Sequence, residues 1–442
     1  MQDNNLMVDF AVPQKKKSII KVIGVGGGGG NAVGHMYREG IHDVSFLVCN
    51  LDAQALEDSP VPVHLQLGDE GLGAGNKPEK ARKAAEDNAD KIREMLSDGT
   101  RMAFITAGMG GGTGTGAAPV IARLSKEMGI LTVGIVTIPF KFEGNRKIDQ
   151  ALDGVEEMSK HVDALLVINN ERLREIYSDL SVPNAFGKAD NTLSVAAKSI
   201  AEIITEHGYM NLDFNDVKTV LKDGGVAIMS TGYGEGESRV KKAIEDALNS
   251  PLLNDNDVYN AKKILLNLSF NPEDGDQAGE SGLMMEEMND VNDFFDKFSN
   301  DFEIKWGITF DSTLEKKVKV TILATGFGIN AVNGMDRHFE KRSQEEIKRQ
   351  AREDEERERR DTRRTEYYGG SMKNTIKRRP SIYLFNTEDL DNDEVILAVE
   401  DTPTYQRTRT QNDEIRSKSK AKPAAAEPTD KPTAAIPGVI SF

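Results

Sequence analysis

The chain has little of what marks exported or membrane-spanning proteins. Cys49 is the single cysteine among 442 residues, so no intramolecular disulfide can form. No apolar run approaches the ~20 residues that a helix needs to cross a bilayer. No basic segment followed by an apolar one stands at the N-terminus, as an export signal requires. We therefore expect a cytoplasmic protein with no direct membrane insertion.

Net positive charge is also lacking. The chain has 56 Lys and Arg residues and 72 Asp and Glu residues, which gives a formal net charge of −16 at pH 7. Such a surface has no broad basic face to displace counterions from a phosphate backbone, so nucleic acid is not an expected partner. The lysine-bearing phosphate loop GxxxxGK[ST] is absent from the sequence as well. Any phosphate bound here must be neutralised by backbone amides, helix dipoles or a cation.

What the sequence does contain is an alternation of short apolar runs with amphipathic segments, from Ser18 to about Gly328. This pattern is typical of an α/β fold with a largely parallel sheet. Five β-branched runs predict a doubly wound first domain, and they span residues 18–25, 44–50, 101–108, 131–138 and 163–169. A long helix is predicted over 191–208. Four more runs predict a second, mixed α/β domain, and they span residues 226–232, 262–270, 303–310 and 317–327.

The composition changes after Gly334, where acidic and basic residues interleave with almost nothing apolar. No core can form from such a run, which is either a solvated helix held by charge pairs or a disordered linker. Residues 417–437 are rich in Lys, Ala, Pro and Thr, and residues 411–442 are predicted to be a disordered tail. The other predicted divisions are an N-terminal extension (1–17), a charged linker (334–397) and a short peptide segment (398–410).

Three glycine-rich stretches stand between a predicted strand or turn and a predicted helix. GMGGGTGTG, from Gly108 to Gly116, has six glycines and two threonines in nine residues. GVGGGGGNA begins at Gly24 and contains the spacing GxGxxG, with Asp52 about twenty residues further on, as in a dinucleotide fingerprint. A tight turn that lets helix and strand approach closely explains this second stretch equally well. GLGAGNKPEK begins at Gly71 and places Pro78 in the first turn of a helix.

These stretches are expected to converge on one ligand. Loops that leave the carboxyl ends of parallel strands open onto the same crevice, and amides at helix N-termini favour phosphate. Three such loops imply several phosphates. Asp52 could help to hold a cation there, through water.

The motifs VIGVGGGGGNA, NLDAQAL, GLGAG, AGMGGGTGTGAAPV, PFKFEG and MNLDFNDV together resemble the tubulin/FtsZ family, in particular its bacterial cell-division members. GGGTGTG is the signature of that family, and the resemblance covers about Ser18 to Phe327. It implies a nucleotide-binding domain (18–190), a core helix with a synergy loop (191–222) and an activation domain (223–333). It also implies a GTPase that uses Mg²⁺ and assembles with copies of itself into head-to-tail filaments, at a mid-cell division site beneath the inner membrane.

The resemblance assigns residues to each part of GTP. Asn50 and Asp52 are placed near the phosphates and Mg²⁺, and Glu143 at the ribose. Lys147 stands where the family usually has arginine, with Arg146 beside it, and lysine lacks the bidentate fork of arginine. The phosphates are assigned to Gly26, Gly27, Gly28, Gly29, Gly30, Asn31, Gly73, Ala74, Gly75, Gly110, Gly111, Gly112, Thr113, Gly114 and Thr115.

Guanine is assigned to Phe186 and Asp190. An aromatic face can stack on a purine, and a carboxylate can accept from both the ring N–H and the exocyclic amine of guanine. From the residues alone, Phe186 in a core and Asp190 as the N-cap of a helix starting near Asn191 explain the stretch as well.

The stretch GYMNLDFNDV is also open to two interpretations. From the residues alone, Asp213 is a good N-cap for a helix over 214–221, and Asp216 is a first-turn acid favoured by the helix dipole. The resemblance instead makes Asn211, Asp213 and Asp216 catalytic, because the family's synergy loop touches the nucleotide of the neighbouring subunit in a filament. Hydrolysis would then depend on assembly.

Near the C-terminus, EDTPTYQRTRTQ resembles the family peptide that docks on membrane-anchoring and regulatory division proteins. Its recognition residues would be Pro403, Tyr405, Arg407 and Arg409, although Gln406 stands where an apolar residue is usual. Two alternatives to a polymerising GTPase remain from the sequence. One is a GTP-binding scaffold that does not hydrolyse, and the other is an oxidoreductase that binds a dinucleotide through GVGGGG.

Overall fold

The chain divides into two units, Met1–Ile347 and Lys348–Phe442, which we describe separately. The predicted N-terminal extension (1–17) lies outside the described residues. The computed structural model describes residues 18–332 apart from 42, 178–180, 207, 251–257, 273–282 and 299–301, together with 335, 338, 339, 342, 356, 359, 360, 363, 392–400, 411, 415 and 418.

The first six strands are all parallel and lie in the order β3-β2-β1-β4-β5-β6. The five strands predicted for the first domain are confirmed, and only β3, with three residues, gives no recognisable pattern in the sequence. The six strands are β1 (Ile20–Val25), β2 (Val44–Asn50), β3 (His64–Gln66), β4 (Met102–Gly108), β5 (Leu131–Ile138) and β6 (Ala164–Asn169).

The connections between these strands are helical. The helix predicted to begin at Pro78 is confirmed, and a second helix follows it after a break at Asn88. The helices are α1 (Gly26–Glu39), α2 (Ala53–Glu57), α3 (Pro78–Asp87), α4 (Ala89–Leu96), α5 (Thr113–Glu127), α6 (Asn145–Ser159) and α7 (Asn170–Ile176), with a 3-10 turn at Lys141–Glu143.

The second half extends the same sheet. β8 pairs parallel with β6, with Ala164 opposite Gly225, and β11, β9, β10 and β7 follow outward from β8. β11 is antiparallel to both neighbours, so this part of the sheet is mixed, as predicted. Its elements are β7 (Gly208–Met210), α9 (Phe214–Leu221), β8 (Gly225–Gly234), α10 (Arg239–Leu248), β9 (Lys263–Phe270), α11 (Met288–Phe295), β10 (Glu303–Phe310) and β11 (Val318–Phe327), with 3-10 turns at Val258–Asn260, Met285–Glu287, Ser312–Leu314 and Ile329–Ala331.

Both faces of the parallel part of the sheet are buried. Along β1, Ile23 and Val25 join the apolar cluster that includes α3 to α6. Ile20 and Val22 join the cluster that includes α1 and the long helix α8 (Val182–Thr205). This explains why the strands of the first half are continuous apolar runs rather than alternating ones.

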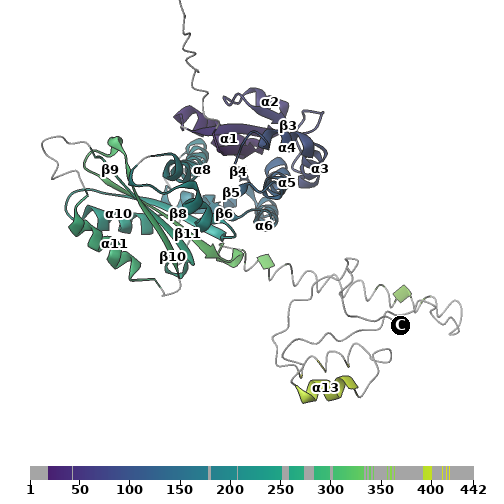
Figure 1. Ribbon diagram of the computed structural model, residues 1–442. Helices are drawn as coiled ribbons and strands as arrows, with labels where there is room; N and C mark the ends of the chain where they lie inside the picture. The colour runs from purple at the N-terminus through teal and green to yellow at the C-terminus, as the bar shows by residue number, and fades with distance from the viewer. Residues whose placement is uncertain are drawn as a thin grey trace, which may run out of the picture. The chain divides into compact units, whose positions relative to one another are not determined.

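The long helix α8 (Val182–Thr205) lies between the two halves (Figure 1). Its apolar face shares one cluster with Leu265 of β9 and Leu323 of β11. The Ser194 hydroxyl donates to the carbonyl oxygen of Ala32 in α1, at 3.2 Å. α8 therefore holds the halves together. In the described part of the chain, neither α8 nor any other helix is long and apolar enough to cross a membrane.

The segment after β11 packs onto the first half. Met335 is fully buried in the cluster that includes Ala151 and Val155 of α6, and Phe339 packs against the same cluster. These residues lie within the predicted charged linker, so apolar packing extends past Gly334, where the composition gave no reason to expect it.

Few residues of the second unit are described. α13 (Asp393–Glu400) buries Val395 against Ile415. The Asn392 amide donates to the carbonyl oxygen of Lys418 at 3.2 Å. The four recognition residues predicted between Pro403 and Arg409 lie outside the described residues.

The tight contact between α1 and β4 predicts that two glycine substitutions in α1 affect stability differently. A Cβ on Gly29 would lie 2.2 Å from the backbone oxygen of Thr106, whereas a Cβ on Gly27 would meet no atom within 4 Å. Gly29→Ala should lower the free energy of unfolding by about 1–3 kcal/mol. Gly27→Ala should leave it unchanged or raise it by roughly 0.5–1 kcal/mol. Urea unfolding followed by circular dichroism measures both, and equal shifts of the two midpoints would contradict this packing.

Candidate functional site

The glycines predicted to form loops build the first turns of two helices instead. α1 begins at Gly26, directly after β1, and α5 begins at Thr113, shortly after β4. Glycine is a poor helix former. It is needed at Gly29 because α1 lies directly against the Thr106 backbone, where any side chain would clash. The expectation of loops is therefore wrong at these positions, because close packing overrides helix propensity.

The two helix N-termini lie side by side. β1 and β4 are neighbouring parallel strands, with Val25 opposite Ala107. Gly26 has a φ of +73°, and a Cβ there would lie 2.9 Å from the backbone nitrogen of Gly114. Neither helix has a side-chain hydrogen bond at its N-cap, so the first-turn N–H groups of both can bind an anion.

The third glycine stretch joins the same place. A Cβ on Gly112 would lie 2.7 Å from the Cβ of Ala74 and 3.1 Å from the backbone nitrogen of Lys77. The Gly73 N–H donates to the carbonyl oxygen of Leu51 at 3.2 Å, which ties this stretch to the end of β2. The structure thus brings the three predicted stretches together.

Exposure separates the predicted phosphate residues into two groups. The buried ones shape the site; for example, the Thr115 hydroxyl accepts the Gly110 N–H at 2.9 Å. The accessible ones can touch a ligand directly. Gly27, Gly28, Asn31 and Gly75 are exposed, Gly30, Gly73, Gly111 and Thr113 are half-buried, and Gly26, Gly29, Ala74, Gly110, Gly112, Gly114 and Thr115 are buried.

Gln150 of α6 is a site residue that the sequence did not reveal. Its amide nitrogen donates to the carbonyl oxygens of Gly110 and Gly111, at 3.2 and 2.8 Å. These bonds fix the peptide units of Gly110 and Gly111, in the stretch from Gly108 to Gly116. The only signal in the sequence was its position one helical turn after Lys147.

Asn50 and Asp52 organise the turn after β2. Asn50 is buried, and its Oδ1 accepts the N–H groups of Leu51 and Asp52 at 2.9 and 3.3 Å. Asp52 is the N-cap of α2, where its Oδ1 accepts from Gln54 and Ala55. Asp52 is therefore a turn residue that caps a helix, and these bonds leave its Oδ2 for another partner.

Glu143 and Lys147 form a pair at the start of α6. Glu143 Oε1 accepts the Phe140 N–H at 2.9 Å, and its Oε2 lies 3.3 Å from Lys147 Nζ. A Cβ on Gly110 would lie 2.7 Å from the carbonyl oxygen of Lys147, which places this pair beside the glycine segment. Arg146 is exposed.

Phe186 and Asp190 lie one turn apart on the same face of α8. The helix begins at Val182, so the interpretation of Asp190 as an N-cap is wrong, and so is that of Phe186 as a core residue, since it is 40% exposed. The Phe186 ring lies edge-on to Phe140, with 5.1 Å between centroids. Burial raises the pKa of Asp190 to about 6.

The acids after α8 form a capping box at the start of α9. Asp213 Oδ1 accepts the N–H groups of Asn215 and Asp216, and Asp216 Oδ2 accepts the Asp213 N–H at 3.1 Å. The predicted helix over 214–221 and its cap are therefore confirmed. Partial burial alone would raise the pKa of Asp216, but the Asp213 N–H and the Lys305 ammonium, 3.1 Å away, hold it below its usual value.

Asn211 and these acids are far from the glycine segments. From Phe186 to Thr205 alone, α8 rises by about 28 Å at 1.5 Å per residue. The acids follow β7, the edge strand at the opposite end of the sheet from β3. Asn211 Oδ1 accepts the Gly208 N–H at 2.6 Å. Among the described residues, no hydrogen bond or ion pair joins the acids to the glycine segments.

Sequence comparisons connect this arrangement to known proteins. The model of the tubulin/FtsZ family GTPase domain matches residues 19–178, that of the FtsZ family C-terminal domain matches 225–328, and a second FtsZ C-terminal model matches 377–422. The cell division protein FtsZ of Porphyromonas gingivalis is 53% identical over 405 residues, which cover 88% of this chain and 85% of that protein. FtsZ of Azotobacter vinelandii is 45% identical over 72% of this chain and 79% of its own.

Solved structures agree with the sequence comparisons. An empty FtsZ dimer from M. jannaschii has a TM-score of 0.64 and 38% identity, covering 71% of this chain and 89% of its own. The GTPγS-bound CetZ2 protofilament of Haloferax volcanii has a TM-score of 0.62 at 18% identity, covers 74% of this chain and 99% of its own, and shows the shared fold. Neither the scaffold nor the oxidoreductase alternative is favoured by these relatives. The chain belongs to the tubulin/FtsZ family and is a filament-forming GTPase of cell division.

Proposed function

We propose that GTP and Mg²⁺ bind across the three glycine segments, and that hydrolysis begins only when a second copy adds Asn211, Asp213 and Asp216. The observation that carries this proposal is the separation of the two groups. One chain holds uncapped helix N-termini suited to phosphates at one place and a carboxylate pair at another. A head-to-tail contact brings the first group of one copy to the second group of the next.

The phosphates lie against the N–H groups of the first turns of α1 and α5. Gly27, Gly28 and Gly111 supply accessible amides, and Gln150 keeps the peptide units around Gly110 and Gly111 in place. Helix dipoles add positive potential at both termini. Such an arrangement explains how the chain manages without a phosphate-loop lysine.

Mg²⁺ fits beside Asp52. A carboxylate oxygen is the ligand type that this ion prefers, usually with several of its waters retained. Asp52 Oδ1 is used in capping α2, so Oδ2 is the atom that would accept from a water of the hydrated ion. When bound, Mg²⁺ would neutralise charge on the phosphates.

Guanine lies against Phe186 and Asp190. The exposed face of Phe186 stacks on the purine, and Phe142, 58% exposed, extends the same aromatic surface. The Asp190 carboxylate accepts from guanine, which adenine cannot match. Glu143 accepts a hydrogen bond from a ribose hydroxyl and gives up its contact with Lys147. Lys147 can then turn toward a phosphate.

The two acids have different roles in hydrolysis. The low pKa of Asp216 makes it a poor base, and its oxygens already contact the Asp213 N–H and Lys305. Asp213 Oδ1 is used in the cap, whereas its Oδ2 remains for the attacking water. Asp213 therefore orients the water and accepts its proton, and Asp216 holds Asp213 in place.

Exposed apolar side chains flank both halves of the shared site. Tyr209 and Met210, just before the acids, are 80% and 37% exposed, and Leu72, in the third glycine segment, is 84% exposed. A contact between these two surfaces buries apolar area on each copy and repeats along a filament, because the two surfaces differ.

The segment from Pro403 to Arg409 is the proposed docking peptide for membrane-anchoring and regulatory division proteins. Its support is the composition of the peptide and the FtsZ C-terminal match over 377–422. Through such partners the filament would lie at the mid-cell division site, beneath the inner membrane.

The pKa of Asp190 predicts a pH dependence of guanine binding. Because guanine donors favour the ionised carboxylate, binding lowers this pKa, and affinity is greatest above the free-chain value of about 6. GDP affinity should fall by up to about tenfold per pH unit below that value. The terminal phosphate of GDP also titrates near pH 6. Asp190→Asn is therefore the matched control, and GDP titrations that weaken equally in both chains would contradict the assignment.

Substitution of the acids tests the catalytic proposal. Asp213→Asn should reduce turnover by about a hundredfold or more, because it removes the base that accepts the proton of the water. Asp216→Asn should cost less, since Asp216 acts by holding Asp213. GDP affinity should be unchanged in both, as the acids serve the neighbouring copy. Phosphate release at several protein concentrations measures the effect, with Thr219→Ala, an exposed change on α9, as the control; undiminished turnover by Asp213→Asn filaments refutes the role.

A further inference from the structure

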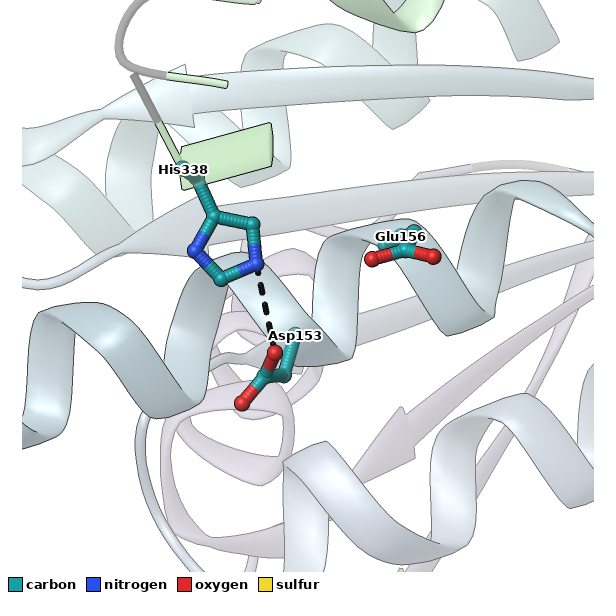
Figure 2. Close-up of side chains that lie close together, drawn as sticks. All are labelled: Asp153, Glu156 and His338. Atoms are coloured by element: carbon teal, nitrogen blue, oxygen red, sulfur yellow. Dashed lines mark ion pairs between the residues drawn. The ribbon is translucent and has the colours of Figure 1, made fainter. Parts of the chain in front are cut away.

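Three side chains with metal-ligating atoms meet on the surface of α6, and none of them is among the residues predicted to bind the nucleotide. Asp153 and Glu156 are three residues apart on the helix, so they lie on one face, and His338 comes from the segment after β11 (Figure 2). One ligand atom from each residue lies within 4.8 Å of the others. A single cation can therefore contact all three.

His338 points into this cluster with an unsatisfied nitrogen. The residue is only 6% exposed, and its Nε2 is buried without a hydrogen-bond partner among the described residues. Asp153 Oδ1 lies 3.2 Å from Nε2, yet the geometry does not make a hydrogen bond. A metal ion bound to both atoms would satisfy the imidazole nitrogen, because it needs no N–H directed at the carboxylate.

The ligand chemistry selects among metals. Mg²⁺ and Ca²⁺ prefer oxygen ligands alone, whereas a neutral imidazole suits Zn²⁺ and neighbouring transition metals. One imidazole, two carboxylates and a water make a four-coordinate zinc site. The Asp153 side chain is 59% exposed, which leaves room for that water and a path for the ion to enter.

Two cations already contact Glu156. Arg342 Nη1 lies 2.5 Å from its Oε2, and Lys160 Nζ lies 3.4 Å from its Oε1. Arg342 stands four residues after His338, so both reach α6 from the same short segment. An incoming metal ion must compete with Arg342 for the carboxylate.

We propose that Asp153, Glu156 and His338 bind a divalent transition-metal cation of the Zn²⁺ type, which takes the place of Arg342 on Glu156. The ion would hold the segment after β11 against α6. α6 also carries Gln150, which bonds to Gly110 and Gly111. The metal ion would therefore bind the same helix that supports the proposed nucleotide site.

The test is a Zn²⁺ titration of the full chain, saturated with GDP and with excess Mg²⁺, in competition with a chromophoric chelator. The parent should bind one Zn²⁺ that His338→Ala and Asp153→Asn bind at least about tenfold more weakly. Arg342→Ala should bind it more tightly, since the competing guanidinium is gone. Asp153 is exposed, so its substitution leaves the fold intact even if that of His338 does not.

His161→Ala is the matched control. His161 also lies beside a carboxylate of α6, with its Nε2 3.6 Å from Glu157, but it belongs to no three-ligand cluster among the described residues. This variant should bind Zn²⁺ like the parent. Equal affinity of the parent and Asp153→Asn, or weaker affinity with Arg342→Ala, would overturn the proposal.

Discussion

The site depends on the close approach of two glycine-rich helix N-termini. α1 and α5 leave neighbouring strands, and the contacts around Gly26 and Gly29 leave no space for even a methyl group. Glycine costs helix stability at these positions, and the burial of the sheet on both faces must offset that cost. These glycines leave the first-turn N–H groups of both helices beside one another, an arrangement suited to binding phosphate without a lysine.

The second constraint is the length of α8. It carries Phe186 and Asp190, the proposed guanine-binding pair, near its start and leads into the acid segment at its end, so the two parts cannot meet in one chain. α8 is also fixed to both halves: Ser194 bonds to α1, and Glu202 pairs with Lys319 of β11 at 3.0 Å. In the proposed filament, α8 would therefore fix the distance between the nucleotide site of each copy and the acids that this copy offers to its neighbour.

Much of the fold follows from local sequence, whereas parts of the site do not. The central strands are β-branched runs between turn residues, so their positions are confirmed within a residue or two. The sequence predicts later starts for α1 and α8 than the structure has. The glycine run and the stretch VPNAFGKAD have poor helix propensity, which tertiary packing overrides. The capping and catalytic interpretations of Asp213 are compatible with each other. The confirmed cap uses Oδ1, and Oδ2 is left for the proposed attacking water. Gln150 and His338 act through contacts with residues distant in sequence, which no local pattern reveals.

Mixing two inactive variants tests the shared site most directly. Asp213→Asn retains the glycine-rich stretches but lacks the proposed base, and Gly112→Trp retains the acids but clashes with Ala74 and Lys77 in the proposed nucleotide site. Each should hydrolyse GTP poorly alone. Mixed filaments should regain turnover, because the acids of the second variant face GTP held by the first. If the mixture is no more active than the sum of its parts while both variants co-assemble, the account of a site completed by a second copy is contradicted.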